Sequence, residues 1–530
     1  MLRRAWKPVA ALTGIAGTSS YLWYSYSRSR NSETFEFPVR VRGADGKASM
    51  STLTVPLLPK DEVERRIKEN AVVETIASQG NISWKHATVS LASNDPIEDA
   101  STNGVIPRDT ISRGSVGDFL FFAVMDGHSG PYTSRLLSRT LIPAVTLELK
   151  TMVIDDPNNK APTSFLESLK ALLWPVPSSA VPPDSDPEKV TAAIERAFVN
   201  LDSELINAPL RVLAASIDRT NREKKTLPDL SQHPMALATL RPALSGSCAL
   251  AALLDTAHKR LYVACTGDSR AVAGVWEDNN DGTGYWRVEA LSEDQTGRNP
   301  KELERMRSEH PQDEAEDVIR NGRVLGGLEP TRAFGDARYK WPREIQQVLK
   351  QSFMPDNDEM RGPSPRLKTP PYVTSRPVVT QTPISLPSPD LETKPKSTFR
   401  FVILATDGLW DRISSEDAVA LVGGYLSGLK GSIPKVTLPS LVPTVSGAAT
   451  VNGKAQAPKQ VPGEWTFVDD HVGAHLLRNA LAGANEMALR QLLSIPAPHS
   501  RRYRDDITVT VIYWEERPET TETGPVKAKL

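Results

Sequence analysis

The chain has 530 residues, a length that allows one large domain or two to three smaller ones. Its 63 basic and 64 acidic residues nearly cancel, which argues against a nucleic-acid binder. The only two cysteines, Cys248 and Cys265, lie in apolar runs. This placement predicts two core residues and argues against a disulfide scaffold or a cysteine-rich zinc site.

The first 32 residues are basic, contain several serines and threonines, and lack acidic side chains. This composition is typical of a mitochondrial transit peptide. Within the segment, residues 9–26 are uncharged and end in Tyr21-Leu22-Trp23-Tyr24, a sequence suited to a membrane interface. Because the run approaches the roughly 20 apolar residues that span a bilayer, a membrane anchor and association with the inner membrane stay open. A secretory signal peptide is the alternative, and the scarcity of cysteines argues against it.

The rest of the first half alternates between helix and strand patterns. Apolar residues at helical spacing predict helices over 60–76, 132–149 and 190–206. Alternating residues predict a strand over 84–91, and the apolar run 121–125 predicts a buried strand. Residues 155–188 are rich in proline, serine and aspartate, so we expect a loop insertion there.

In the second half, the pattern predicts a hairpin over 244–275 with its turn at 255–259. A second hairpin turn is expected at 278–282, where the spacing does not fit a calcium loop. The remaining predicted elements are an exposed charged helix over 302–319, a long last helix over 471–493 and a final strand over 507–514. Residues 355–396 and 431–463 lack apolar periodicity and are broken by proline, glycine and serine, which predicts mobile insertions.

Acidic residues stand at the ends of the apolar runs. Asp126, Asp268 and Asp407 each follow such a run, and Asp505 comes shortly before the final one. A surface turn is the ordinary explanation for a single Asp-Gly pair, but it does not explain four carboxylates on core strands. We interpret them as ligands of one cation site, at which hard oxygen donors favour Mg²⁺ or Mn²⁺ over zinc.

Seven short motifs stand in a fixed order between residues 93 and 514. They are Glu98-Asp99, Asp126-Gly127-His128-Ser129-Gly130, Ser245-Gly246-Ser247, Gly267-Asp268-Ser269-Arg270, Thr331-Arg332-Ala333-Phe334-Gly335-Asp336, Ala405-Thr406-Asp407-Gly408-Leu409-Trp410-Asp411 and Arg504-Asp505-Asp506-Ile507-Thr508. In this order they resemble the metal-dependent type 2C family of protein serine/threonine phosphatases. The stretches Ser93-Asn94-x-Pro96-x-Glu98-Asp99 and Arg323-Val324-Leu325-Gly326, with Arg338-Tyr339-Lys340-Trp341, resemble its mitochondrial pyruvate dehydrogenase phosphatase branch.

The resemblance implies an α+β fold, a β-sandwich of two antiparallel sheets flanked by helices. It also implies two Mg²⁺ or Mn²⁺ ions in a cleft at one end of the sandwich. By this likeness, Asp126 bridges both ions and the Gly127 carbonyl binds one of them. Asp407 and Asp505 hold the other ion.

The likeness also implies roles for residues around the two ions. Glu98 and Asp99 lie close by and act largely through waters, and Asp268 matches the acid that supports a third metal in some relatives. His128 matches the proposed general acid for the leaving hydroxyl. Many members carry an arginine that grips the phosphate before the Glu-Asp pair, and here Asn94 is the nearby polar residue. The chain has Asp506 where the family often has asparagine, which adds negative charge beside the site.

The implied activity is hydrolysis of phosphoserine and phosphothreonine in proteins by a metal-activated water, with the pyruvate dehydrogenase complex as candidate substrate. No nucleophilic side chain is then required, and neither cysteine has the arginine six residues on that a cysteine-nucleophile phosphatase needs. An inactive scaffold that binds partner proteins is the alternative. Such a scaffold is expected to have lost Asp126, Asp407 or Asp505, and all three are present.

We therefore expect three parts: a targeting segment over 1–32, a phosphatase domain over 60–515 and a C-terminal tail over 516–530. The tail ends in Ala528-Lys529-Leu530, close to the peroxisomal Ser-Lys-Leu address. A chance tripeptide is the alternative. The sequence thus predicts a mitochondrial protein and raises a second pool in peroxisomes as a hypothesis.

Overall fold

A computed structural model gives the fold of the chain. It describes residues 33–516 except 43–47, 80–81, 109–116, 155–182, 280, 282, 356–361, 388–394 and 448–461. The predicted transit peptide and anchor, most of the insertion at 155–188 and nearly all of the C-terminal tail lie outside the described residues. Among the helices that are described, none is long and apolar enough to cross a bilayer.

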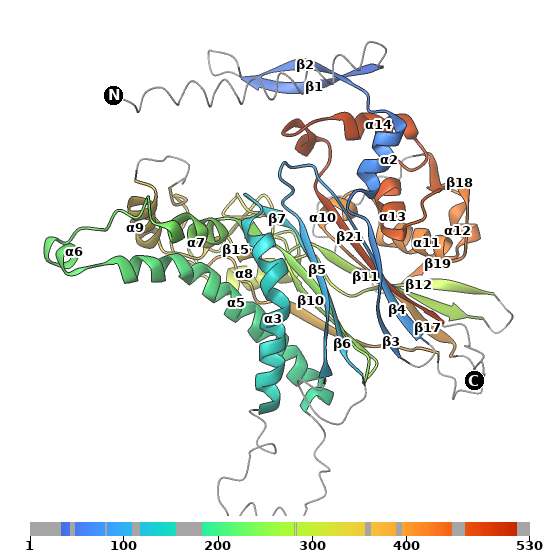
Figure 1. The fold of residues 1–530 in the computed structure, drawn as a ribbon, viewed down its shortest axis with the longest axis horizontal. Coiled ribbons are helices and arrows are strands. Elements are labelled where there is room, and N and C mark those ends of the chain that lie inside the picture. Colours follow the sequence, from blue (N-terminus) through green and yellow to red (C-terminus); the bar gives the residue numbers. More distant parts are fainter. Residues whose placement is uncertain are drawn as a thin grey trace, which may run out of the picture.

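Two sheets form the centre of the molecule (Figure 1). The five-stranded sheet has the order β16 (Val378–Pro383), β10 (Arg260–Thr266), β9 (Ala249–Asp255), β6 (Phe119–Met125) and β5 (Ala100–Ile106). The seven-stranded sheet has the order β19 (Thr444–Ser446), β12 (Gly284–Ala290), β11 (Arg270–Asp278), β17 (Ser397–Ala405), β21 (Ile507–Glu516), β4 (Ile82–Leu91) and β3 (Val72–Gln79). Paired strands are antiparallel throughout both sheets, apart from the parallel pair of β12 and β19.

The inner faces of the two sheets pack on each other. Phe122 and Leu250 from the five-stranded sheet share one core with Trp84 and Trp514 from the seven-stranded sheet. All seven residues of β6 are buried, because the sheet is covered on both faces. A strand buried on both faces reads as an unbroken apolar run, which is why the sequence predicted it correctly.

Helices cover the outer faces, which completes the predicted α+β sandwich. On the five-stranded sheet, α3 (Tyr132–Ile154) and α5 (Pro187–Ser216) pack residues such as Leu141 and Phe198 against Phe121. The seven-stranded sheet is covered by α2 (Lys60–Lys68), α11 (Ser415–Leu426) and α13 (Val472–Leu481). Both cysteines are buried and free, as predicted.

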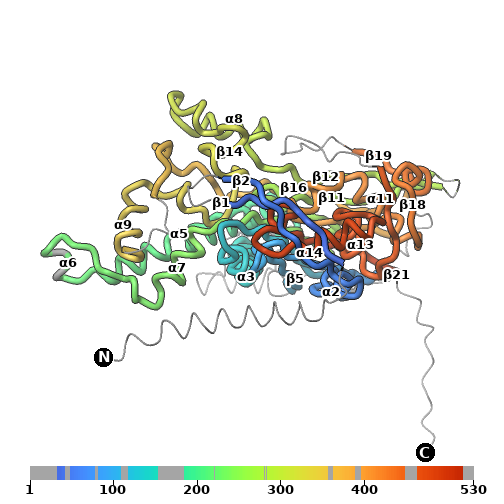
Figure 2. The backbone as a smooth tube through the Cα atoms, turned by 90° about the horizontal axis from the view of Figure 1, so that it is seen from above, coloured from blue at the N-terminus to red at the C-terminus, as the bar shows by residue number. Residues whose placement is uncertain are grey.

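A smaller helical unit stands at one side of the sandwich. It contains the C-terminal half of α5 with α7 (Pro234–Leu244) and α9 (Arg343–Phe353), and it has its own apolar core around Leu240 and Leu349. Figures 1 and 2 both place these helices, with α6 (Arg219–Lys224), at the end of the molecule away from α11 and α13.

The predicted helix over 60–76 is wrong in its second half. The helix ends at Lys68, and Val72–Gln79 forms the edge strand β3. Residues 72 and 73 are both valine, and β-branched side chains favour a pleated strand over a helix. Their spacing from Val63 and Ile67 matched a helix only by coincidence.

The last predicted helix, over 471–493, is two helices. After α13 the chain turns at Gly483, which has a φ of 58° and so occupies a region that favours glycine. Asn485 then caps α14 (Glu486–Ser494) by accepting a hydrogen bond from the amide of Ala488. The charged helix predicted over 302–319 is also shorter, since α8 (Pro300–Ser308) ends early.

Parts of the predicted mobile insertions are regular strands. In the segment 355–396, Val378–Pro383 is the edge strand β16, which pairs with β10. In the segment 431–463, β18 (Gly431–Pro434) pairs with β20 (Glu464–Phe467), and β19 joins β12. These strands lie at sheet edges or in small ribbons, where backbone pairing requires little apolar periodicity. The prediction of irregular structure is therefore wrong for these residues.

Candidate active site

Three of the predicted acids meet at one edge of the sandwich. Since β6 and β10 both pair antiparallel with β9, they run in the same direction and end at the same edge. Asp126 follows β6 there, and Asp268 follows β10 after a two-residue step. Asp407 approaches from the other sheet, at the end of β17. Each residue offers a carboxylate oxygen, and these oxygens all lie within 4.8 Å of one another.

The three carboxylates repel each other strongly. Burial raises the pKa of Asp126 well above its ordinary value, and the negative charges of Asp407, Asp99 and Asp268 raise it further. A cluster of this kind keeps its charge at neutral pH only when a cation compensates it. The atoms that would bind the metal are hard carboxylate oxygens, which favour Mg²⁺ or Mn²⁺ over softer metals.

Asp99 lies directly behind this cluster. Its side chain is buried and accepts a hydrogen bond of 2.9 Å from Thr406 Oγ1, the residue before Asp407. Burial and the charge of Asp506 raise the pKa of Asp99 to about 8. The structure thus brings Asp99 to the same edge, as predicted.

Glu98 ties two loops of the site together. One carboxylate oxygen accepts a hydrogen bond from the amide of Gly130, and the other accepts one of 3.1 Å from Asn94 Nδ2. The backbone carbonyl of Glu98 lies so close to Gly127 that a Cβ there would stand 2.1 Å from it. This contact with the carbonyl of Glu98 is the reason that glycine is required at position 127.

Asp505 does not join the three-carboxylate cluster. Its Oδ1 pairs with Arg501 and accepts a hydrogen bond of 2.7 Å from the amide of Asp506. Its Cβ nevertheless lies beside the Asp407-Gly408 turn, 3.1 Å from the position that a Cβ on Gly408 would take. The residue therefore stands at the rim of the cluster.

His128 is held by a residue to which the sequence interpretation assigned no role. Its Nε2 lies 2.7 Å from Oδ2 of Asp336 in a hydrogen bond. Burial opposes a charged ring, but the charge and hydrogen bond of Asp336 outweigh it and raise the pKa of His128. Asp336 ends the fifth motif, so its position was marked in the sequence, but nothing in the sequence connects it with His128.

Asp506 was interpreted as extra negative charge beside the site, and the structure gives it a positioning role. It is buried, and its carboxylate accepts hydrogen bonds of 2.9 Å from the amides of Asn94 and Glu98 and from Asn94 Nδ2. It also accepts a hydrogen bond from the amide of Ser93. These contacts fix the loop that carries Glu98 and Asp99.

The loop at residues 331–336 is anchored by a buried ion pair. Arg332 donates from Nη2 to Glu302 on α8 at 2.8 Å, and Arg305 of the same helix donates to Glu302 at 2.7 Å. Thr331 adds a hydroxyl donor to the same carboxylate. Because this loop ends in Asp336, the anchor at Glu302 indirectly sets the position of His128.

An antiparallel sandwich that gathers aspartates at one edge, with a histidine beside them, fits the chemistry of a metal-dependent hydrolase. A family model described as "Protein phosphatase 2C" matches residues 190–428. A protein phosphatase 2C homolog of Schizosaccharomyces pombe is 36% identical over 463 residues, covering 87% of this chain and 87% of that protein. The chain belongs to the protein phosphatase 2C family and is a metal-dependent protein serine/threonine phosphatase.

Other relatives carry the name of the branch that the sequence resembles. The mitochondrial pyruvate dehydrogenase phosphatase 1 of Saccharomyces cerevisiae is 31% identical over 496 residues, covering 88% of this chain and 74% of that protein. The human mitochondrial protein of the same name is 36% identical over 288 residues, covering 52% of this chain and 48% of its own length. These matches confirm the resemblance to this branch.

Replacing Asp506 by asparagine should destabilise the site loop. The amide nitrogen of the new side chain would face backbone N–H groups, which leaves donors unpaired at a cost of about 1–3 kcal/mol. We expect a lower denaturation midpoint in urea together with reduced phosphatase activity. Asp95→Asn, at an exposed position of the same loop, serves as the matched control and should change neither. A D506N protein with the wild-type midpoint would contradict the positioning role.

Glu302 should stabilise the protein in a pH-dependent way. Burial alone would raise its pKa, but hydrogen bonds from Arg332 and Arg305 lower it from 4.5 to about 2. This lowering corresponds to about 3 kcal/mol of stability, fully present above pH 4.5 and lost as the pH falls toward 2.

The stability gap between wild type and Glu302→Gln should therefore be large at pH 7 and smaller at pH 3.5. Thermal unfolding at both pH values measures it, with Glu304→Gln, at an exposed position on the same helix, as control. If the difference in stability between the two proteins were independent of pH, the ion pair of Glu302 would not be its cause.

Proposed function

We propose that the centre binds two divalent cations, Mg²⁺ or Mn²⁺, and uses them to hydrolyse phosphoserine and phosphothreonine in a mitochondrial protein substrate. The observation that carries this proposal is the approach of Asp126, Asp268 and Asp407 to within 4.8 Å of one another. We assign the catalytic domain to residues 60–515, as the order of motifs suggests.

Asp126 and Asp407 are the proposed principal ligands, together with the Gly127 carbonyl. Asp505 at the rim and Asp268 are proposed to complete the coordination as further carboxylate ligands. When bound, such ions lower the pKa of a shared water and offset the charge of the phosphate oxygens. Asp99, which lies behind the cluster, and Glu98, which holds the Asn94 and Gly130 loops together, are proposed to orient waters at its edge. Fixed loops keep all of these oxygens in place.

His128 is proposed to protonate the departing serine or threonine oxygen. Because its Nε2 is engaged by Asp336 at 2.7 Å, the other ring nitrogen, Nδ1, is the one that can serve the leaving group. The raised pKa of His128 favours the protonated ring that a general acid needs. Asp336 acts through this histidine and is a positioning residue.

Asn94 is better suited to positioning than to gripping phosphate. Its Nδ2 donates to Glu98 at 3.1 Å and to Asp506 at 2.9 Å, so both of its amide hydrogens are engaged. We therefore propose Asn94 as a positioning residue and not as one that grips the phosphate. Its contribution is to hold Glu98 against the loop.

Activity should depend on the cations and on the cluster that holds them. In excess EDTA a phosphopeptide should not be hydrolysed, and Mg²⁺ or Mn²⁺ should restore the reaction. Asp126→Asn or Asp407→Asn should lower kcat by at least about a hundredfold, since losing a group that stabilises transition-state charge costs about 10²–10³. Asp313→Asn, at an exposed position, is the control. Full activity in excess EDTA would disprove the proposal.

The named relatives support a substrate in the pyruvate dehydrogenase complex and a mitochondrial location. The chain should release phosphate from the phosphorylated complex faster than from unrelated phosphoproteins at equal concentration. An internally tagged chain should enter mitochondria, and deletion of residues 1–32 should abolish entry. Equal rates on all phosphoproteins would reject the substrate, and entry without residues 1–32 would reject the targeting role of that segment.

A further inference from the structure

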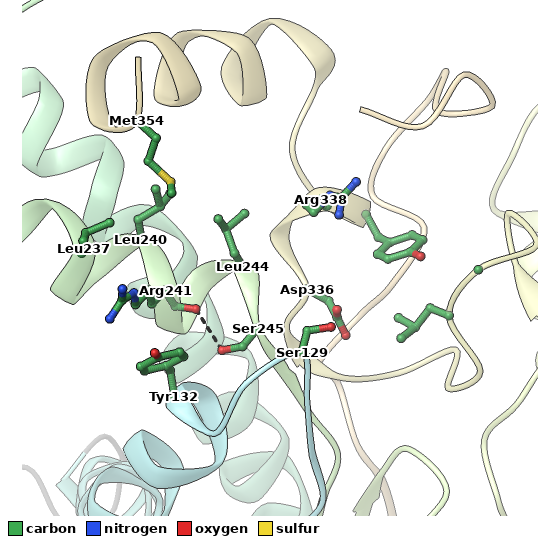
Figure 3. A pocket seen from close by; sticks show the side chains of 13 residues that line it. Ser129, Tyr132, Leu237, Leu240, Arg241, Leu244, Ser245, Asp336, Arg338 and Met354 are labelled. Atoms are coloured by element: carbon green, nitrogen blue, oxygen red, sulfur yellow. Dashed lines mark hydrogen bonds between the residues drawn. The ribbon is translucent and has the colours of Figure 1, made fainter. Parts of the chain in front are cut away.

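A cavity opens in the helical unit, between α7 and the loop that carries Asp336 (Figure 3). Its volume is about 460 Å³. Asp336, which holds His128, is part of its wall, and so is Ser129, the next residue after that histidine. A phosphorylated side chain that reaches the cluster would therefore place its own neighbours in sequence at this cavity.

One wall of the cavity is apolar. Leu237, Leu240 and Leu244 stand on one face of α7, at spacings of three and four residues, and Met354 comes from the chain just after α9. Figure 3 shows Met354 reaching toward Leu240 from the helix above it. Leu237, Leu244 and Met354 are only partly buried by the rest of the chain. This wall can take an apolar side chain of a substrate.

The rim of the cavity is basic. The exposed guanidinium of Arg241 lies 5.3 Å from the ring centre of Tyr132, and Arg338 donates to the carbonyl of Gly362 at 3.0 Å. Within the part of the chain that the structure describes, neither arginine forms an ion pair with a carboxylate. Among the wall residues that the structure describes, the one acid is Asp336, and it is already engaged by His128. A carboxylate of the substrate is thus the complementary partner for this rim.

We infer that this cavity recognises the residues that flank the phosphorylated serine or threonine, and that it selects an apolar side chain next to an acidic one. The inference rests on the proposed function and adds a substrate class to it. Leu244 and Met354 contact the apolar side chain, and Arg241 and Arg338 contact the carboxylate.

Synthetic phosphoserine peptides test the inference directly. One set carries a Leu-Glu pair at successive positions up to four residues before or after the phosphoserine. The matched sets carry Ala-Gln or Leu-Lys at the same positions. At one position, kcat/KM for Leu-Glu should exceed that for Leu-Lys about fivefold, the size of an exposed ion pair, with the change mainly in KM. It should exceed that for Ala-Gln about tenfold or more.

Charge reversal separates recognition from a merely structural role. Arg241→Glu should invert the preference, so that the Leu-Lys peptide becomes the better substrate. Met354→Ala should reduce the preference for leucine over alanine and leave the charge preference in place. Arg211→Glu, at an exposed position on α5 outside the cavity, is the control and should keep the wild-type ratios.

The possible failures are distinguishable. If the wild type hydrolyses all peptides equally well, or if Arg241→Glu leaves the charge preference unchanged, the inference is overturned and the proposed function stands. If the wild type hydrolyses neither the peptides nor p-nitrophenyl phosphate in Mn²⁺, the proposed function falls and the inference falls with it.

Discussion

Mutual repulsion among carboxylates at one edge of the sandwich is the constraint that the rest of the structure serves. Asp126, Asp268 and Asp407 would separate if the chain let them, because like charges at this spacing are costly away from bulk water. They stay together because each stands at or near the end of a strand that is packed within the sandwich. Packing of the apolar strands therefore compensates the electrostatic free energy of this repulsion until a bound cation offsets it.

Two other buried carboxylates, by contrast, are surrounded by hydrogen-bond donors. Glu302 is surrounded by arginine and hydroxyl donors, so its pKa falls to about 2 and it remains charged. Asp506 is satisfied by backbone amides. Neither has spare capacity for a ligand, and both fix loops. Asp126 in the cluster, by contrast, has a raised pKa, because it is buried and because the charges of Asp407, Asp99 and Asp268 surround it, and that imbalance marks the functional centre.

The sequence predicted the acids of the centre better than the residues that hold the surrounding loops in place, and the reason is physical. An unbroken apolar run followed by an acid is a local signal, and it located Asp126, Asp268 and Asp407. The contact between His128 and Asp336 joins residues 208 positions apart, and that between Asn94 and Asp506 joins residues 412 apart. No local pattern encodes such pairs. The strand Val378–Pro383 was missed for a related reason, since its order comes from pairing with β10.

Asp336 connects the chemistry of the centre with the cavity beside it, because it contacts His128 and also lines that cavity. Its backbone has a φ of 47°, a left-handed conformation that must be held from outside. Two buried ion pairs hold it. Glu302 fixes Arg332 before it, and Lys340 after it donates to Asp202 at 2.6 Å. A loop pinned at both ends cannot adjust to each substrate, so selection must come from the fit of the substrate to the cavity.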